Sequence, residues 1–237
     1  MNKRSVRQKL RLPAADTACI PALLTFCLLV LLTAGGCADL SQLTQPNLKI
    51  ESYTIEVSLP EKSARTLPCA LRIRQFTTNP LYATSAMVYK TKDYQTAAYT
   101  YHRWHIPPTG ITAAALHQSL RAAGICRAVF GPDAVNPADY WLDGHLETFL
   151  ENDTVSPWQA ELALVVTLVD ADAAEPRRQV LLQKRYTATE PCVRDNPRAL
   201  AEAMSRALET VTAEIITDVT ARLAEIENQS GTDLSPE

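Results

Sequence analysis

Glycine is scarce in this chain, and the few glycines are scattered. Of the 237 residues only seven are glycine, and five of these lie beyond position 36. None of the five forms part of a glycine-rich loop of the kind that cradles a nucleotide phosphate. The serine elbow of hydrolases, the two-histidine helix motif of zinc proteases and paired-cysteine metal motifs are also missing. The sequence therefore argues against an ATPase and shows no known catalytic motif.

Cysteine is too sparse for a disulfide framework. Only Cys69, Cys126 and Cys192 follow Cys37. In an oxidising compartment at most one disulfide can form among these three cysteines, and an odd number of cysteines argues against a small domain held together by disulfides. We expect buried or unpaired thiols.

Positive charge is also lacking after the N-terminal segment. Residues 37–237 carry 18 lysines and arginines against 25 acidic residues, a net charge of −7. Such a surface repels phosphate backbones and anionic lipid headgroups. We predict no nucleic-acid partner, and a membrane attachment that does not rely on a basic patch.

The N-terminus has the layout of a secretory signal. Five basic residues precede an uncharged apolar run over residues 18–34, and two glycines lead to Cys37. A signal peptide that stops at a cysteine is the bacterial lipoprotein pattern, in which the thiol is acylated and the peptide removed. Residues 1–36 are thus predicted to be a signal peptide and Cys37 the lipidation site, with its acyl chains in place of any cofactor or metal. Acyl chains contribute about 0.8 kcal/mol per buried CH₂, which is enough for a lasting anchor.

An uncleaved transmembrane anchor is the alternative interpretation of this segment. The apolar run is at the short limit for a membrane span and is interrupted by Pro21. Either way, the remainder is expected outside the cytoplasm. Residues 37–48 are predicted to form a tether, residues 49–227 a single domain and residues 228–237 a disordered polar tail.

Periodicity within the domain predicts about eight strands and two helices. The expected strands are 53–59, 71–76, 85–89, 94–106, 125–130, 140–151, 162–169 and 179–188, and the expected helices are 109–123 and 197–226. This order of four strands, a helix, four strands and a helix indicates an α/β (α+β) domain. Its sheet should be mixed and largely antiparallel, with both helices packed on it, and a duplicated β-rich half with its helix would give the same order. On strand 140–151, Asp143, Glu147 and Glu151 are expected to face water.

Two groups of residues could suggest a metal site. His102 and His105 have odd spacing on a predicted strand, so their side chains point to opposite faces. Asp143, His145 and Glu147 have spacing i, i+2, i+4, which puts all three on one face at about 7 Å intervals. A metal or acid–base function there is one interpretation, and a solvated sheet face is the other.

Aromatic residues are concentrated in one region. Seven of the fifteen lie between positions 76 and 104. On the predicted strand 94–106, Tyr99 and Tyr101 share a face with Arg103, whereas Tyr94 and Trp104 share the other face. A mixture of tyrosine, tryptophan and arginine is typical of protein interfaces. Tyr99, Tyr101, Arg103 and Trp104 are therefore the candidate partner-binding residues, with packing against the core as the alternative.

Several short motifs, taken in order, resemble a known family. The segments concerned are 53–55 (YTI), 87–89 (MVY), 99–104 (YTYHRW), 107–108 (PP), 139–146 (DYWLDGHL) and 203–208 (AMSRAL). From about residue 51 to residue 226 the chain is similar to the ABC-type transport auxiliary lipoproteins, which include the PqiC-like lipoproteins.

This resemblance implies a non-catalytic periplasmic accessory protein. Its partners would be a substrate-binding protein of the mammalian-cell-entry type with an ABC ATPase and a permease, in a system that moves lipids or other hydrophobic compounds between membranes. The family has no known catalytic residues to carry over. In Gram-negative lipoproteins, an aspartate directly after the lipidated cysteine signals retention in the inner membrane. Ala38 in this position therefore favours the outer membrane over the inner, and Asp39 one place later leaves this open.

Two other functions stay open at this stage. One is a periplasmic lipid-binding module that itself receives cargo, which needs an apolar pocket. The other is a lipid-anchored hydrolase or metal enzyme centred on Asp143, His145 and Glu147. Self-association of the chain is also left open.

Overall fold

The computed structural model describes residues 49–173 and 179–232. The predicted signal peptide, the lipidation site Cys37 and the tether lie outside the described residues, as does the end of the predicted tail, residues 233–237. The described residues from Lys49 onwards form one compact unit.

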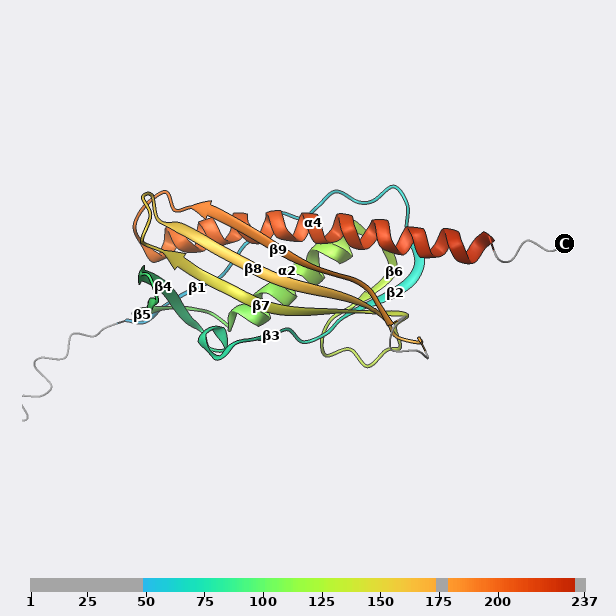
Figure 1. The fold of residues 1–237 in the computed structure, drawn as a ribbon, viewed down its shortest axis with the longest axis horizontal. Coiled ribbons are helices and arrows are strands. Elements are labelled where there is room, and N and C mark those ends of the chain that lie inside the picture. Colours follow the sequence, from blue (N-terminus) through green and yellow to red (C-terminus); the bar gives the residue numbers. More distant parts are fainter. Residues whose placement is uncertain (1–48, 174–178, 233–237) are drawn as a thin grey trace, which may run out of the picture. The chain divides into compact units, whose positions relative to one another are not determined.

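Nine strands and two α-helices occur among the described residues (Figure 1). They are β1 (Glu51–Tyr53), β2 (Leu67–Ile73), β3 (Thr77–Thr78), β4 (Ala86–Lys92), β5 (Gln95–Trp104), α2 (Pro108–Ala123), β6 (Cys126–Phe130), β7 (Tyr140–Asn152), β8 (Gln159–Asp170), β9 (Val180–Pro191) and α4 (Pro197–Thr232), with a short 3₁₀ turn, η2 (Pro80–Tyr82). The strand beyond the predicted eight is the two-residue β3.

The strand β7 organises the sheet. Along one edge it pairs antiparallel with β8 over its whole length, and β8 pairs in the same way with β9. Along its other edge, β7 pairs in parallel with β2 near its start, with β3 in the middle and with β4 at its end. Two short branches continue outward, from β2 to β6 and from β4 to β5 to β1. The long pairings are antiparallel and the short ones mostly parallel, which confirms the predicted mixed sheet.

Both predicted helices are present, and each has a capping residue. The helix α2 ends at Gly124, whose φ of 63° is the left-handed conformation that glycine adopts without strain. At the start of α4, the side-chain oxygen of Asn196 accepts a hydrogen bond from the backbone N–H of Ala199 at 2.9 Å. The predicted disordered tail is wrong for residues 228–232, because α4 continues to Thr232. Extending a formed helix needs no new nucleation, so polar residues can prolong it.

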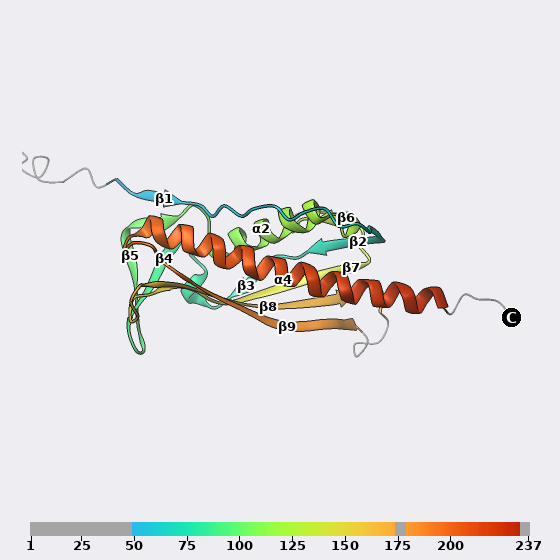
Figure 2. The ribbon, with the colours of Figure 1, turned by 90° about the horizontal axis from the view of Figure 1, so that it is seen from above.

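The helix α4 buries a continuous apolar stripe. The buried members are Leu200, Met204, Leu208, Val211, Ile215, Val219 and Leu223. Each such side chain contributes about 1.5–3 kcal/mol relative to exposure. The stripe packs on β8 and β9, and α4 also contacts α2. In Figure 1 both helices lie behind β7, β8 and β9, and Figure 2 shows α4 running along these strands. One face of this part of the sheet is therefore covered, and the other is open.

The predicted strand 53–59 is wrong for most of its length, since only Tyr53 belongs to a strand. Its alternation still describes burial, because Ile55 and Val57 pack against the core. The backbone N–H of Glu56 donates to the Ser205 hydroxyl of α4 at 3.2 Å, and that of Ser58 to a Glu209 carboxylate oxygen at 3.2 Å. The segment thus docks on a helix rather than on a strand.

Candidate docking surface

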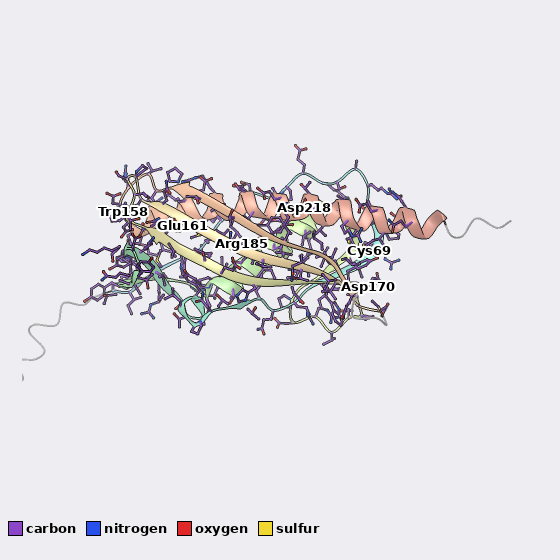
Figure 3. The ribbon with its side chains drawn as sticks, viewed as in Figure 1. Cys69, Trp158, Glu161, Asp170, Arg185 and Asp218 are labelled. Atoms are coloured by element: carbon purple, nitrogen blue, oxygen red, sulfur yellow. The ribbon has the colours of Figure 1, made fainter. Side chains whose placement is uncertain are left out.

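The three candidate acid–base or metal residues lie on β7, and each has its own partner. The Arg74 guanidinium makes a two-pronged ion pair with Asp143 and stacks over the Trp141 ring at 4.9 Å. The Nδ1 of His145 lies 2.8 Å from the Thr77 hydroxyl. The Glu147 carboxylate is paired with Arg185 of β9, which Figure 3 labels on the strands.

Asp143, His145 and Glu147 are thus each engaged by a neighbouring side chain. Within residues 49–173 and 179–232, no group of three or more histidine, cysteine, aspartate or glutamate side chains is placed to hold a metal ion. A shallow hollow of about 470 Å³ lies beside Asp143 and His145, and its other polar lining includes Arg74 and Gln183. Gln183 donates to the Thr167 hydroxyl at 3.0 Å, so this group is also satisfied within the protein. The arrangement is that of a solvated sheet face.

An apolar hollow opens between residues 58–60 and the two helices. Leu59, Pro60, Ala213 and Ile216 contribute its apolar lining, and its volume is about 220 Å³. Ligand pockets usually measure roughly 300–1,000 Å³. This hollow is therefore too small to enclose a whole lipid.

A large irregularity in β5 decides how its aromatic residues point. Ala86 of β4 pairs with Arg103 and Val88 pairs with Ala98, so four residues of β5 face the single residue between them. A bulge of this kind breaks the simple in–out alternation. The prediction that Tyr99, Tyr101 and Arg103 share one face is therefore wrong.

Trp104 belongs to the core. Its side chain is 1% exposed and packs edge-to-face on Phe149, with ring centroids 5.3 Å apart. A partner protein cannot reach it in the folded domain. Its inclusion among the candidate partner-binding residues is wrong, and the packing alternative holds for it.

Tyr99 also turns inward. Its hydroxyl donates to a carboxylate oxygen of Glu151 at 2.6 Å, and its ring packs 4.8 Å from Tyr89 and edge-on to His102 at 5.8 Å. Burial raises the pKa of this tyrosine, and the neighbouring carboxylate raises it further. Tyr99 therefore anchors β5 to β7 and offers little surface to a partner.

Glu151 was expected to face water, and the structure buries it completely. The pairing of β7 with β8 slips by one residue at Glu147, and this slip exchanges the inward and outward positions that follow it. Burial raises the pKa of Glu151 to about 7, although the Tyr99 hydrogen bond opposes the shift. The Cys192 thiol lies 3.9 Å from the other carboxylate oxygen, and burial raises the pKa of this thiol to about 12. No signal in the sequence marks the slip.

Two of the four candidates, Tyr101 and Arg103, do face solvent. Tyr101 is 41% exposed and Arg103 is exposed. The parallel pairing of Glu51 with His102 places the preceding residues, Ile50 and Tyr101, next to each other, and Ile50 is 49% exposed. Tyrosine and arginine are enriched among the residues that dominate interface energies.

Tyr94 lies apart from these residues, at the tip of the β4–β5 hairpin, which projects to one side of the sheet in Figure 2. Its side chain is fully exposed, and its φ of 62° is a conformation that bulky residues rarely adopt outside a tight turn. Ile50, Tyr101 and Arg103 are called the edge surface below.

Comparison with solved structures supports the fold. The chain is similar to a protein from Xanthomonas campestris, with 17% identity, a TM-score of 0.66, and coverage of 76% of this chain and 99% of that one. An uncharacterised protein gives 15% identity, a TM-score of 0.53, and coverage of 68% and 99%. A hypothetical protein from Chlamydia trachomatis gives 8% identity, a TM-score of 0.46, and coverage of 66% and 98%. The first two show a shared fold.

Comparison with curated proteins finds no match. Among the described helices, none has the length and apolar content that a membrane span requires. The model of the ABC-type transport auxiliary lipoprotein component matches residues 53–216, which is well over half of the chain. The chain therefore belongs to the family of ABC-type transport auxiliary lipoprotein components.

Proposed function

We propose that this protein is a membrane-anchored, non-catalytic subunit that docks the periplasmic part of an envelope ABC-type transport complex at the membrane. The partner would be a substrate-binding protein of the mammalian-cell-entry type, working with an ATPase and a permease to move lipids or other hydrophobic compounds. Acyl chains on Cys37 would hold the domain on the periplasmic side, at the outer membrane rather than the inner. Family membership and the signal layout before Cys37 support this proposal.

The chemistry of the open face supports a role without catalysis. Asp143 and Glu147 are each neutralised by an arginine, and both ion pairs are partly exposed to solvent. A catalytic acid or base needs a pKa tuned to its task and a free position beside the substrate. The ion pairs occupy these carboxylates, which suits a surface that binds rather than reacts.

The single observation that carries the docking role is the edge surface. It places Ile50, immediately before β1, beside Tyr101 of β5, with Arg103 two residues further along β5, and all three side chains are exposed.

A photo-crosslinking experiment tests this role. The full-length chain would carry p-benzoylphenylalanine in place of Tyr101, and a control chain would carry it in place of Val193, which is 78% exposed after β9. We expect irradiation of cells to link the Tyr101 position to the mammalian-cell-entry protein and the Val193 position to no such partner. We also expect the double variant Tyr101→Ala, Arg103→Ala to reduce co-purification at least about tenfold, as loss of about 1.4 kcal/mol or more would.

The two readouts separate the two parts of the proposal. If the wild-type chain does not co-purify with a mammalian-cell-entry protein, the docking role is wrong. If it does, and the double variant co-purifies equally well, docking uses another surface.

A further inference from the structure

Two of the three cysteines that follow Cys37 meet inside the described domain. Cys69 lies on β2 and Cys126 begins β6, the neighbouring parallel strand. Their sulfur atoms are 2.7 Å apart. The side chains are 8% and 5% exposed, so both thiols lie in the core. Figure 3 labels Cys69 toward the end of the sheet that carries Asp170, away from Trp158.

We propose that Cys69 and Cys126 form a disulfide in the mature protein and that Cys192 remains a free thiol. The inference rests on the proposed location of the domain on the oxidising side of the membrane. It goes beyond that location because it assigns which cysteines pair and what the bond holds.

The backbone already brings the two residues together. Adjacent strands are about 4.8 Å apart. The register pairs Cys126 with Leu67, and Cys69 lies in the slip between Leu67 and Ala70, where β2 advances three residues while β6 advances two. The two sulfur atoms are only about 0.7 Å farther apart than a disulfide bond requires. Bond formation thus needs a small side-chain adjustment and no rearrangement of the sheet.

The oxidant would be a disulfide-bearing partner, either a thiol–disulfide oxidoreductase or a small disulfide such as oxidised glutathione. The Cys69 thiolate attacks one sulfur of that disulfide, a mixed disulfide forms, and the first partner thiolate leaves. Cys126 gives its proton to this leaving thiolate and then attacks the Cys69 sulfur. The second partner thiolate leaves and takes up the proton that Cys69 released. Two cysteine thiols lose two electrons in total, and the partner disulfide becomes a dithiol. Burial implies that the exchange precedes closure of the fold.

Cys192 is excluded from this pairing by its position. It is 1% exposed, and its thiol lies beside Glu151. Burial raises the pKa of this thiol to about 12, so it stays protonated and unreactive.

The bond would secure a branch of the sheet that is joined to β7 by a short pairing. The edge strand β6 pairs with β2, and β2 pairs with β7 through only three residue pairs, from Leu71 to Ile73. The loop closed by the disulfide runs from Cys69 to Cys126 and contains the β4–β5 hairpin and α2. It would therefore restrain the segment that carries most of the edge surface.

Thiol counting in the full-length protein tests the pairing. The protein would be produced in the envelope of a Gram-negative host, denatured, and treated with a maleimide before or after reduction. Among Cys69, Cys126 and Cys192 we expect one labelled thiol, Cys192, before reduction and three after it. Peptide mass mapping should show the Cys69 and Cys126 peptides joined, with two hydrogens fewer than the sum of the separate peptides. Labelling of all three without reduction would overturn the proposal.

The intact mass of the full-length protein separates a failure of the cysteine pairing from a failure of the proposed location. A chain that retains residues 1–36 and lacks acyl chains would contradict the anchor, whatever the state of its thiols. In that case the reduced protein would be refolded in a buffer of reduced and oxidised glutathione. Formation of the Cys69–Cys126 bond there would support the pairing, and its absence would refute it.

Thermal unfolding gives a second, independent test. Closing a loop of this length should raise the Tm by roughly 10 °C. We expect protein that is reduced in denaturant and refolded in reductant to have a Tm lower by this amount than the untreated protein, for the wild type and for Cys192→Ala, and an unchanged Tm for Cys69→Ala. A wild-type Tm that is the same after this treatment would show that no such bond is present.

Discussion

Acidic residues have opposite environments on the two faces of the β7–β8–β9 sheet. On the open face, Asp143 and Glu147 are partly exposed and paired with arginines. On the covered face, Glu151 is fully buried between the Tyr99 hydroxyl and the Cys192 thiol, and burial raises its pKa to about 7. All three acids lie on one strand. The difference shows that the local register, and not the residue type, decides whether a carboxylate lies in an exposed ion pair or is buried.

The largest expected contrast between the faces is in packing. Leu164 of β8 is fully buried on the covered face, and its neighbour Val165 lies on the open face beside the polar hollow. We expect Leu164→Ala to lower the free energy of unfolding by about 2–5 kcal/mol, because it leaves a cavity. Val165→Ala should cost less than about 1 kcal/mol. Urea unfolding measures both, and equal losses would show that the open face is covered in solution.

The second contrast is in pH dependence. The folded-state pKa of Glu151, about 7, lies above its ordinary value of 4.5, so the folded state binds the proton more tightly. The stabilisation is complete below pH 4.5 and is lost as the pH rises through 7, with a total change of roughly 3 kcal/mol. We expect Glu151→Gln to remove most of this slope between pH 5 and 8 in urea unfolding.

Tyr99→Phe is the matched variant for this measurement. The Tyr99 hydroxyl lowers the pKa of Glu151, so its removal should move the pH midpoint upward while the slope remains. If Glu151→Gln keeps the wild-type slope, another group governs the pH response.

The smallest expected effect is on the open face. The double variant Asp143→Ala, His145→Ala removes the ion pair with Arg74 and the contact with Thr77, both partly exposed. Exposed pairs contribute about 0–1 kcal/mol, so the free energy of unfolding should change by about 1 kcal/mol or less. Envelope integrity in cells that carry the double variant should match that of the wild type. A loss of function with unchanged stability would restore the enzyme hypothesis.

Long periodic segments were predictable from the sequence. The helices predicted at 109–123 and 197–226 and the strands predicted at 85–89 and 94–106 follow from local patterns, and the structure confirms them as α2, α4, β4 and β5. The strand predicted at 71–76 misses the start of β2, which begins at Leu67. Pro68 lies within β2, inside the pairing slip between Leu67 and Ala70, where a missing N–H is tolerated.

The candidate site was predictable only in part, because two slips in register lie inside it. One exchanges the orientations of residues 99–102 on β5, and the other exchanges those that follow Glu147 on β7. Register slips arise from pairing between distant strands, and local alternation carries no record of them. Tyr101 and Arg103 were placed correctly as exposed, whereas Trp104 and Glu151 were not.

The chain enters the described domain through β1, which is three residues long and pairs only with β5. A force applied to the chain before residue 49 would act first on the short parallel pairing of β1 with β5 and then on β5, before it reached the core. The strand that takes up this load also carries Tyr101 and Arg103. If acyl chains on Cys37 hold the chain at a membrane, as proposed, a force from that anchor and a partner bound to these two side chains would act on the same few backbone hydrogen bonds between β1 and β5.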